Sequence, residues 1–337
     1  MSARVGHNLD VERLKSFLRS MVAIRAFEEE ALAAQKEGLV KGAIHPSIGQ
    51  EAVAVGVCAE LRRDDVLLST HRGHGHTLAK GADPFAMMAE LMGRAPGTSQ
   101  GKGGSMHIAD FSVGMLGANG VVAANIGIAA GAAHAIRLLG GDRIVCCIFG
   151  DGAVNRGPFL EGLNWAAVYR LPVLFVCEDN GFAATTRTRE LTAGEGPLAR
   201  ARALGIEGET VDGNDVLAVA EATRALVATV RSGAGPRFLH CLTYRLCGHT
   251  GADPATYRPA AEVEARWKDC PIARARALLE GAGVARAELD ALEAEARAAI
   301  AEVARAARAA PWPDPSLAWT DVQDLGAELR PEGSARA

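Results

Sequence analysis

The sequence predicts an α/β protein built on a parallel sheet with helices on both faces. Three continuous apolar runs read as strands, namely RIVCCIF (143–149), PVLFVCE (172–178) and FLHCLTYRL (238–246). Helical stretches separate these runs, and strands that are apolar on both faces indicate a sheet that is covered on both sides. The composition agrees, since 49% of the 337 residues are hydrophobic and 23% are charged.

Helical segments extend this core at both ends of the chain. Apolar residues recur at helical spacing over 9–36, a second helix is expected from about 49 to 61, and 65–69 has the pattern of a short buried strand. Beyond about residue 262 the chain is rich in Ala, Arg and Glu and is helical. We therefore expect an N-terminal helical segment (1–36), a ligand-binding α/β domain (37–260) and a C-terminal helix and tail (261–337), which together form one structural domain.

Several classes of protein are disfavoured by composition. The net charge is −4 and no block of Lys and Arg stands out, so a nucleic-acid partner is not expected. The N-terminus has no apolar signal region and no stretch reaches bilayer-spanning length, which predicts a cytoplasmic protein without a membrane partner. The seven cysteines include no CxxC pair, and four of them lie in apolar strands, as expected for reduced, buried thiols.

Polar residues stand directly after two of the predicted strands. Asp151 follows the strand 143–149 and Asn180 follows the strand 172–178. The carboxyl ends of neighbouring parallel strands meet at one edge of the sheet, where ligands bind. A carboxylate and an amide oxygen suit Mg²⁺, and the amides of Gly152 and Ala153 open a helix that can bind a diphosphate. This pattern predicts a site for Mg²⁺ and a diphosphate.

The Gly-Asp-Gly tripeptide alone is a common turn. It indicates a metal site here because an Asn follows about thirty residues later, after the next strand. No Walker A motif and no GxGxxG motif is present. The stretch GDG…EDN resembles the thiamine-diphosphate motif. More broadly, residues from about 10 to 325 resemble the α subunit of heterotetrameric thiamine-diphosphate-dependent dehydrogenases. The motifs that carry this resemblance are IGQEA (48–52), THRGHGH (70–76), GKGGSMHIAD (101–110), GANGVV (117–122), GDGAVNRG (150–157), VDGND (211–215) and TYRLCGHTGADPATYR (243–258).

The resemblance implies a set of cofactor-binding residues. Mg²⁺ would be held by the Asp151 carboxylate, the Asn180 side chain and the backbone carbonyl of Phe182, which replaces the usual Tyr. Asp179 replaces the first Asn of the family's usual pair, and it either adds negative charge near the metal or points into the fold.

The resemblance also assigns residues to the cofactor's other groups. Arg72 would grip the diphosphate, a task that suits its planar guanidinium. His71 stands where acetoin-type members tend to carry His and pyruvate-type members usually carry Tyr. The backbone of Gly120 and Val122 would meet the aminopyrimidine ring. His249 matches the active-site loop histidine that stabilises the cofactor–substrate adduct and its transfer to lipoyl.

The remaining histidines leave alternatives open. His71, His74 and His76 are close enough in sequence to suggest zinc, but no further ligand is nearby, and a cofactor-facing loop in which His74 or His76 meets substrate is favoured. We include His74 among the catalytic candidates, and His107 has the same ambiguity. The other histidines are assigned no site role: His134 and His240 are expected to be structural, and His7 and His45 have no evident function.

The resemblance implies a decarboxylating or acetoin-cleaving dehydrogenase component that uses thiamine diphosphate and Mg²⁺. Its implied partners are a β subunit, in an α₂β₂ heterotetramer, and a lipoyl-bearing acyltransferase. Acetoin is preferred as substrate over pyruvate or a branched-chain 2-oxo acid. Two rivals belong to other classes: a Mg²⁺-dependent phosphohydrolase with Asp151 as nucleophile, and a non-catalytic regulatory subunit.

Overall fold

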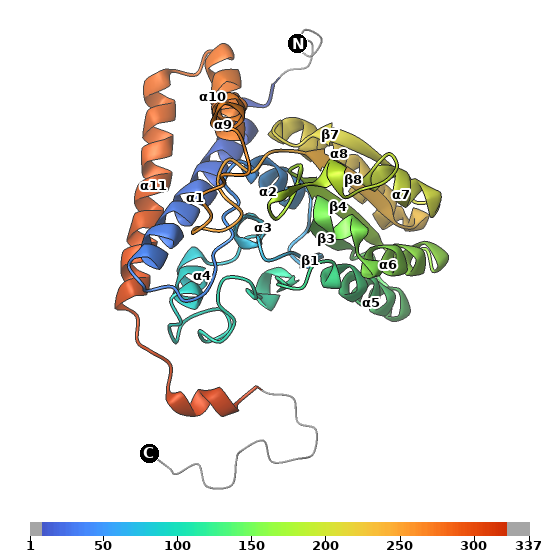
Figure 1. Ribbon diagram of the computed structural model, residues 1–337, viewed down its shortest axis with the longest axis horizontal. Coiled ribbons are helices and arrows are strands. Elements are labelled where there is room, and N and C mark those ends of the chain that lie inside the picture. The colour runs from blue at the N-terminus through green and yellow to red at the C-terminus, as the bar shows by residue number, and fades with distance from the viewer. Residues whose placement is uncertain (1–8, 322–337) are drawn as a thin grey trace.

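A six-stranded parallel sheet lies at the centre of the computed structural model, which describes residues 9–321 (Figure 1). The strand order is β2-β1-β3-β4-β8-β7. The bounds are β1 Val66–Leu68, β2 Met115–Gly117, β3 Val145–Gly150, β4 Val173–Asp179, β7 Gly208–Asp212 and β8 Arg237–Leu242. The predicted fold class is thus confirmed. The edge strands β2 and β7 were not predicted, because β2 lies within the glycine-rich segment and no residue of β7 is fully buried.

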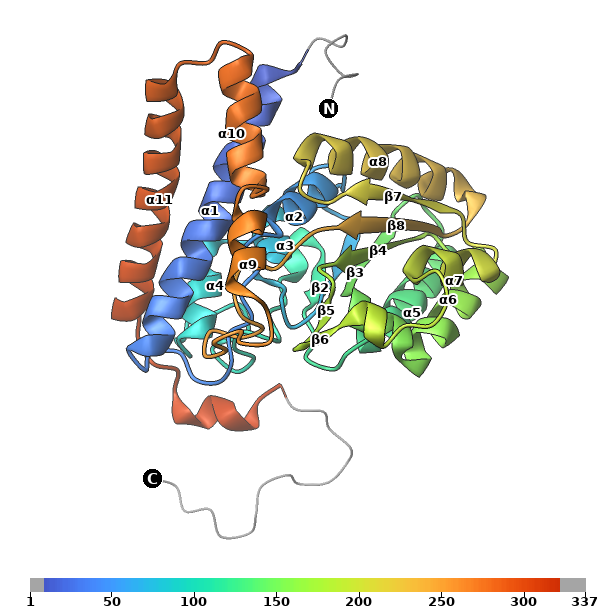
Figure 2. The same ribbon diagram turned by 45° about the horizontal axis from the view of Figure 1, so that its top comes forward.

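Helices cover both faces of the sheet. One face carries α2 (Glu51–Cys58) and α8 (Val216–Thr229), and the other carries α5 (Ala124–Leu139), α6 (Gly157–Val168) and α7 (Pro197–Ala203) (Figure 2). The helix α4 (Pro84–Leu91) packs against helices from the two ends of the chain. Side chains of β3 alternate between the two layers: Cys146 and Ile148 pack in the first, Cys147 and Phe149 in the second. Because both faces are buried, the strand is apolar throughout and its thiols are buried and free, as the sequence predicted.

The two ends of the chain form a helical layer beside the sheet domain. The long helix α1 (Val11–Lys36) is capped at its N-terminus by Asp10, whose side chain accepts a hydrogen bond from the Arg13 amide. It lies along α11 (Arg286–Ala309), next to α10 (Pro271–Gly281), with α9 (Ala260–Trp267) between this layer and the sheet domain (Figure 2). The expected terminal helices are therefore present, while the domain boundaries at 36 and 260 remain predictions. No helix within residues 9–321 is both long and apolar enough to cross a bilayer.

The glycine-rich segment that follows α4 is held in place by one buried acid. The Glu90 carboxylate accepts backbone hydrogen bonds from Ser99, Gly101, Gly103 and Gly104, at 2.7–3.0 Å. A side chain at Gly103 would come within 2.9 Å of a backbone oxygen, which explains the need for glycine there. The segment is therefore an ordered loop, as its retained apolar residues suggested, and it leads through the short helix η1 (Phe111–Val113) into β2.

Candidate active site

The carboxyl ends of β3 and β4 bring Asp151 and Asn180 to one pocket. Gly150 pairs with Glu178 in the parallel register, so the residues that follow each strand leave the sheet at the same edge. Both side chains are buried, and both line a pocket of about 530 Å³. Asp151 begins the short helix η2 (Asp151–Asn155), which turns the chain away from the sheet. The structure thus brings the acid and the amide together at one edge of the sheet, as the sequence predicted.

The environment of Asp151 favours a cation. Burial, followed by the negative charge of Asp179, raises the pKa of Asp151 to about 7. Its Oδ2 accepts a hydrogen bond from the Thr188 hydroxyl, which offsets only part of that effect. A buried carboxylate with a neighbouring acid is stabilised in its charged form by a positive partner. The residues present therefore fit a divalent cation at this position.

A buried glutamine fixes the orientation of the Asn180 amide. The Asn180 Nδ2 donates to Gln50 Oε1 at 2.8 Å, and Asn180 Oδ1 accepts from the Phe182 amide at 3.1 Å. The amide nitrogen is thereby directed toward Gln50, so the oxygen is the atom left to serve as a ligand. Gln50, in the IGQEA motif, was not identified from the sequence as a site residue. It lies in a loop 130 residues from Asn180. Its position in the IGQEA motif was the one sequence signal that could have identified it as a site residue.

The Asp179 carboxylate points into the fold, which is one of the two alternatives that the sequence left open. Its Oδ2 bonds to His240 Nε2 at 2.8 Å, and its Oδ1 accepts from the Gly181 amide at 3.0 Å. Burial alone would raise the pKa of Asp179, but the bond and charge of His240 hold it below its usual value. Asp179 thus points to a neighbouring strand while its charge raises the pKa of Asp151. His240 has the structural environment expected for it.

Hydrogen-bond donors suited to a diphosphate surround the same pocket. Arg72 is buried after β1, and its guanidinium donates to the Pro46 carbonyl at 2.5 Å. The segments around Gly152 and Ala153 also line the pocket. A Cβ on Gly152 would come within 2.9 Å of Ala183, so the close approach of this backbone requires glycine. Arg156 also lines the pocket, and the sequence analysis did not identify it.

The loop that carries Gly120 and Val122 forms another wall of the pocket. Val121 and Val122 remain 66% and 45% exposed, so this wall also faces solvent. His107 is exposed near this wall, since a Cβ on Gly120 would lie 3.4 Å from its Nε2. The structure therefore places the expected aminopyrimidine-binding segment at the pocket, next to an open surface.

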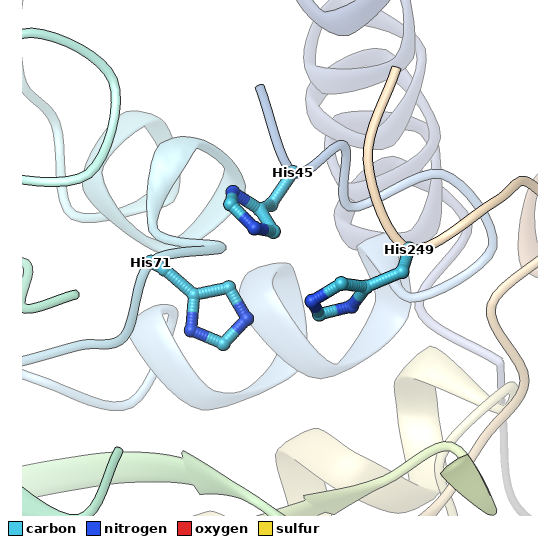
Figure 3. A group of neighbouring side chains, drawn as sticks. All are labelled: His45, His71 and His249. Atoms are coloured by element: carbon cyan, nitrogen blue, oxygen red, sulfur yellow. The ribbon is translucent and has the colours of Figure 1, made fainter. Parts of the chain in front are cut away.

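Three histidines from separate loops point toward one another at the pocket (Figure 3). The ring centroids of His45 and His71 are 4.5 Å apart, those of His45 and His249 4.9 Å, and those of His71 and His249 5.6 Å. Burial, followed by the charge of Arg72, lowers the pKa values of these rings to about 3 for His45, 2 for His71 and 4 for His249. All three imidazoles are therefore neutral at pH 7.

His45 was given no role from the sequence. It is the main pocket residue that sequence reasoning missed. It stands before Pro46 in a loop, and no local pattern marks it as a site residue. His249 Nδ1 lies 3.4 Å from an Arg72 nitrogen and 3.3 Å from an Arg245 nitrogen. Two guanidinium donors thus face one ring nitrogen of the predicted loop histidine.

His74 does not line the pocket, which argues against its expected catalytic role. Its side chain is fully buried, with Nδ1 2.8 Å from Glu28 Oε2 and Nε2 2.9 Å from Ser105 Oγ. Both ring nitrogens are therefore occupied by protein partners, and we do not carry His74 forward as a catalytic residue. His76 does line the pocket, where it bonds to Glu178 at 2.7 Å.

The grouping of histidines around His71 differs from the one that the sequence suggested. The neighbours of His71 that could share a metal are His45 and His249, among the residues that the structure describes, rather than His74 and His76. His134 is half-buried on α5, where it accepts a hydrogen bond from Trp165 Nε1 at 3.1 Å, in agreement with the structural role expected for it. His7 lies outside the described residues.

Comparison with known proteins places these features in context. A family model described as "Dehydrogenase E1 component" matches residues 19–316. The alpha subunit of acetoin:2,6-dichlorophenolindophenol oxidoreductase from Cupriavidus necator is 45% identical over 93% of this chain and 95% of its own length. The corresponding Bacillus subtilis subunit is 45% identical over 77% and 78% of the two chains. The pyruvate dehydrogenase E1 component subunit alpha of Zymomonas mobilis is 41% identical over 94% and 90%.

Proposed function

This chain belongs to the dehydrogenase E1 component family, and from this premise we propose that it is an alpha subunit that binds Mg²⁺ and thiamine diphosphate in the pocket at the ends of β3 and β4. The family resemblance stated from the sequence motifs is thereby confirmed, and the family implies thiamine diphosphate as cofactor. The observation that carries the proposed site is the buried Asp151 carboxylate, with its pKa raised to about 7, at the same sheet edge as the oriented Asn180 amide.

The donor set fits Mg²⁺ chemically. Asp151 supplies a carboxylate oxygen, Asn180 an amide oxygen and Phe182 a backbone carbonyl, and Mg²⁺ takes such hard oxygen ligands together with phosphate oxygens and water. The positive charge of the ion would offset the repulsion between Asp151 and Asp179. Gln50 would support the metal site, because its bond to the Asn180 amide nitrogen leaves the Asn180 oxygen as the atom available to the ion.

The other pocket residues take roles in binding and proton handling. Arg72 and the amides of Gly152 and Ala153 would bind the diphosphate, and Gly120 and Val122 would contact the aminopyrimidine ring. When bound, thiamine diphosphate supplies a nucleophilic thiazolium carbon and an electron sink for cleavage of the bond next to a carbonyl.

His249 would hold a proton at the reacting oxygen. Its ring is neutral at pH 7, so it can donate from one nitrogen while the other faces Arg72 and Arg245. The guanidiniums thereby favour the tautomer with an unprotonated Nδ1 and a protonated Nε2.

Acetoin is the substrate that we favour. The neutral rings of His45, His71 and His249 line the pocket, and neutral donors and acceptors suit the hydroxyl and carbonyl of an uncharged hydroxyketone. Relatives named for acetoin are 45% identical to this chain. Pyruvate or a branched-chain 2-oxo acid is the second candidate, supported by the 41% identical pyruvate dehydrogenase subunit and by the cationic Arg72 and Arg245.

The relatives' names include "subunit alpha", and we propose a β subunit that completes the site in an α₂β₂ heterotetramer. Support comes from the pocket wall at Val121 and Val122, which stays exposed although it lines the pocket. The acyl group would pass to a lipoyl-bearing acyltransferase. A cytoplasmic location and the absence of nucleic-acid and membrane partners remain predictions.

The rival functions have less support. A phosphohydrolase would need further acids and a phosphate-binding lysine at the strand ends, and no lysine is among the described residues that line the pocket. A non-catalytic subunit would not require the buried acid, amide and arginine to converge on one cavity.

Titration of thiamine diphosphate with Mg²⁺ into the co-expressed α and β subunits tests the proposal, with calorimetry as the readout. We expect saturable binding that is lost in Asp151→Ala and retained in Asp64→Ala, an exposed aspartate. Acetoin turnover with dichlorophenolindophenol should require both subunits. Absence of binding by the wild-type pair would contradict the proposed cofactor site, and normal turnover by the α subunit alone would contradict the shared active site.

A further inference from the structure

We propose that Asp179 gives the Mg²⁺ site a second negative charge, so that the α subunit takes up its divalent cation before it binds the diphosphate. The inference rests on the proposed function, because it concerns the cation held by Asp151 and Asn180. Asp179 stands where the family resemblance implies an Asn, so this chain carries one more negative charge at the site than that pattern does. The added charge would set the order in which ion and cofactor bind.

The Asp179 carboxylate is held as an anion next to Asp151. His240 Nε2, on β8, lies 2.8 Å from the Asp179 Oδ2, and the Gly181 amide donates to the Asp179 Oδ1 at 3.0 Å. Burial, the charge of Asp179 and a hydrogen bond between the two carboxyl groups all raise the pKa of Asp151. Because both oxygens of Asp179 already have protein partners, this side chain acts on the ion through its charge rather than as a ligand.

No fixed positive charge neutralises the two acids. Within residues 9–321, neither Asp151 nor Asp179 forms an ion pair with an arginine or a lysine: the donor to Asp151 is the Thr188 hydroxyl, and the partner of Asp179 Oδ2 is the His240 ring. Neighbouring buried carboxylates repel each other and are stabilised by a positive partner. A divalent cation supplies that partner, whereas a diphosphate brings further negative charge to the site.

The second charge changes the dependence of the two ligands on each other. Mg²⁺ usually takes one or two carboxylates and completes its shell with phosphate oxygens and water. With Asp179 behind Asp151, the ion is attracted strongly before any phosphate is present. Arg72 and Arg156 line the pocket and favour the diphosphate, but neither bonds to the two acids. Once the ion is bound, it offsets the repulsion between the acids and the incoming phosphates, so the expected order is cation first and cofactor second.

Asp179→Asn tests the charge with little change of shape. The amide oxygen can still accept from Gly181, and the amide nitrogen can donate to His240 Nε2 when the ring carries its proton on Nδ1. Mn²⁺ is titrated into the co-expressed α and β subunits without cofactor, and the electron paramagnetic resonance signal of the free ion reports binding. At pH 8 Asp151 is charged in both proteins, because its pKa is about 7 in the wild type and falls when the neighbouring charge is removed.

We expect one Mn²⁺ per α chain in the wild-type pair, with an affinity that falls about tenfold or more in Asp179→Asn. Asp212→Asn is the matched control, since it changes an acid at the end of β7, at the same edge of the sheet but outside the pocket lining. It should leave Mn²⁺ affinity unchanged. Thermal unfolding of each variant verifies that it is folded.

Affinity for the cofactor should change in the opposite direction. With a chelator present to remove metal, calorimetry should show that thiamine diphosphate binds Asp179→Asn more tightly than the wild type, because a negative charge has been removed from the pocket. A variant that had merely loosened the site would lose affinity for both ligands. Opposite changes in Mn²⁺ and thiamine diphosphate affinity therefore identify an effect of charge.

Mn²⁺ affinity that is equal or higher in Asp179→Asn would overturn the proposal, and so would a parallel loss of affinity for Mn²⁺ and metal-free thiamine diphosphate. Mn²⁺ that binds the wild-type pair only together with thiamine diphosphate would also overturn it, while the proposed function would stand. Failure of the wild-type pair to bind Mn²⁺ even with the cofactor would contradict the proposed function as well. The wild-type measurements need no variant, so they remain decisive if the substitution prevents folding.

Discussion

The sheet edge at Asp151 and Asn180 and the histidine group at His45, His71 and His249 face one pocket but are built in different ways. The first pair directly follows two hydrogen-bonded strands, whose register fixes where the side chains emerge. The three histidines come from loops separated by up to about two hundred residues of chain. Strand register thus places the proposed metal ligands rigidly, whereas the positions of the histidines depend on the packing of several loops. The first region suits cofactor anchoring, and the second suits adjustable contact with substrate.

Substitution of the carboxylate at the sheet edge should have the largest effect. Asp151→Asn removes the charged metal ligand while it conserves size, so cofactor-dependent turnover of the α and β pair should fall roughly a thousandfold or more, which corresponds to a loss of several kcal/mol. Affinity for Mg²⁺ with thiamine diphosphate, measured by calorimetry, should fall in parallel. Unchanged affinity would show that the ion is held elsewhere.

A change in the histidine group should separate catalysis from anchoring. His249→Gln should lower kcat by about 10²–10⁴-fold, as expected for loss of a general acid or base. Cofactor affinity should change little, since the Asp151 and Asn180 ligands remain. Steady-state kinetics and calorimetry on the same preparation provide the comparison. An equal loss in affinity and kcat would instead assign His249 to cofactor binding.

Gln50 tests whether support behind the sheet edge matters. Gln50→Ala removes the acceptor for Asn180 Nδ2 and should weaken Mg²⁺ binding about 10–100-fold, as for other residues that orient metal ligands. High Mg²⁺ concentrations should restore turnover. The idea fails if the variant binds Mg²⁺ as the wild type does.

The pH dependence of stability should have opposite signs in the two regions. The pKa of Asp151 is raised from an ordinary value near 4 to about 7, so the folded state binds more protons than the unfolded state, and stability falls as pH rises through this window. The three histidines have pKa values of about 2–4 in the folded state, so stability falls as pH drops below about 6.5.

Thermal unfolding between pH 5 and 8 measures both contributions in protein without added metal. Asp151→Asn should remove the loss of stability toward high pH, and His71→Gln should lessen the loss toward low pH. Asp179→Asn should shift the Asp151 contribution to lower pH, because the neighbouring negative charge is gone. A pH profile that is identical in all three variants would contradict this account.

The same contrast explains what the sequence could predict. The apolar strands, the terminal helices and the positions of Asp151 and Asn180 follow from local patterns, because side-chain periodicity and the ends of strands are properties of short segments. His45 and Gln50 could not be found in this way, since their roles arise from contacts more than a hundred residues away in the chain. The same limit explains His74, whose sequence neighbourhood suggested substrate contact although Glu28 and Ser105 bury it. The edge strand β7 was missed because none of its residues is fully buried.

The location of the bound ion tests the central claim most directly. Mn²⁺ can replace Mg²⁺ in crystals of the α and β pair with thiamine diphosphate, and its anomalous scattering marks its position. The account predicts a peak within bonding distance, about 2.0–2.3 Å, of oxygens from Asp151, Asn180 and Phe182. A Mn²⁺ peak away from Asp151 and Asn180, or one that only one of these residues contacts, would contradict it.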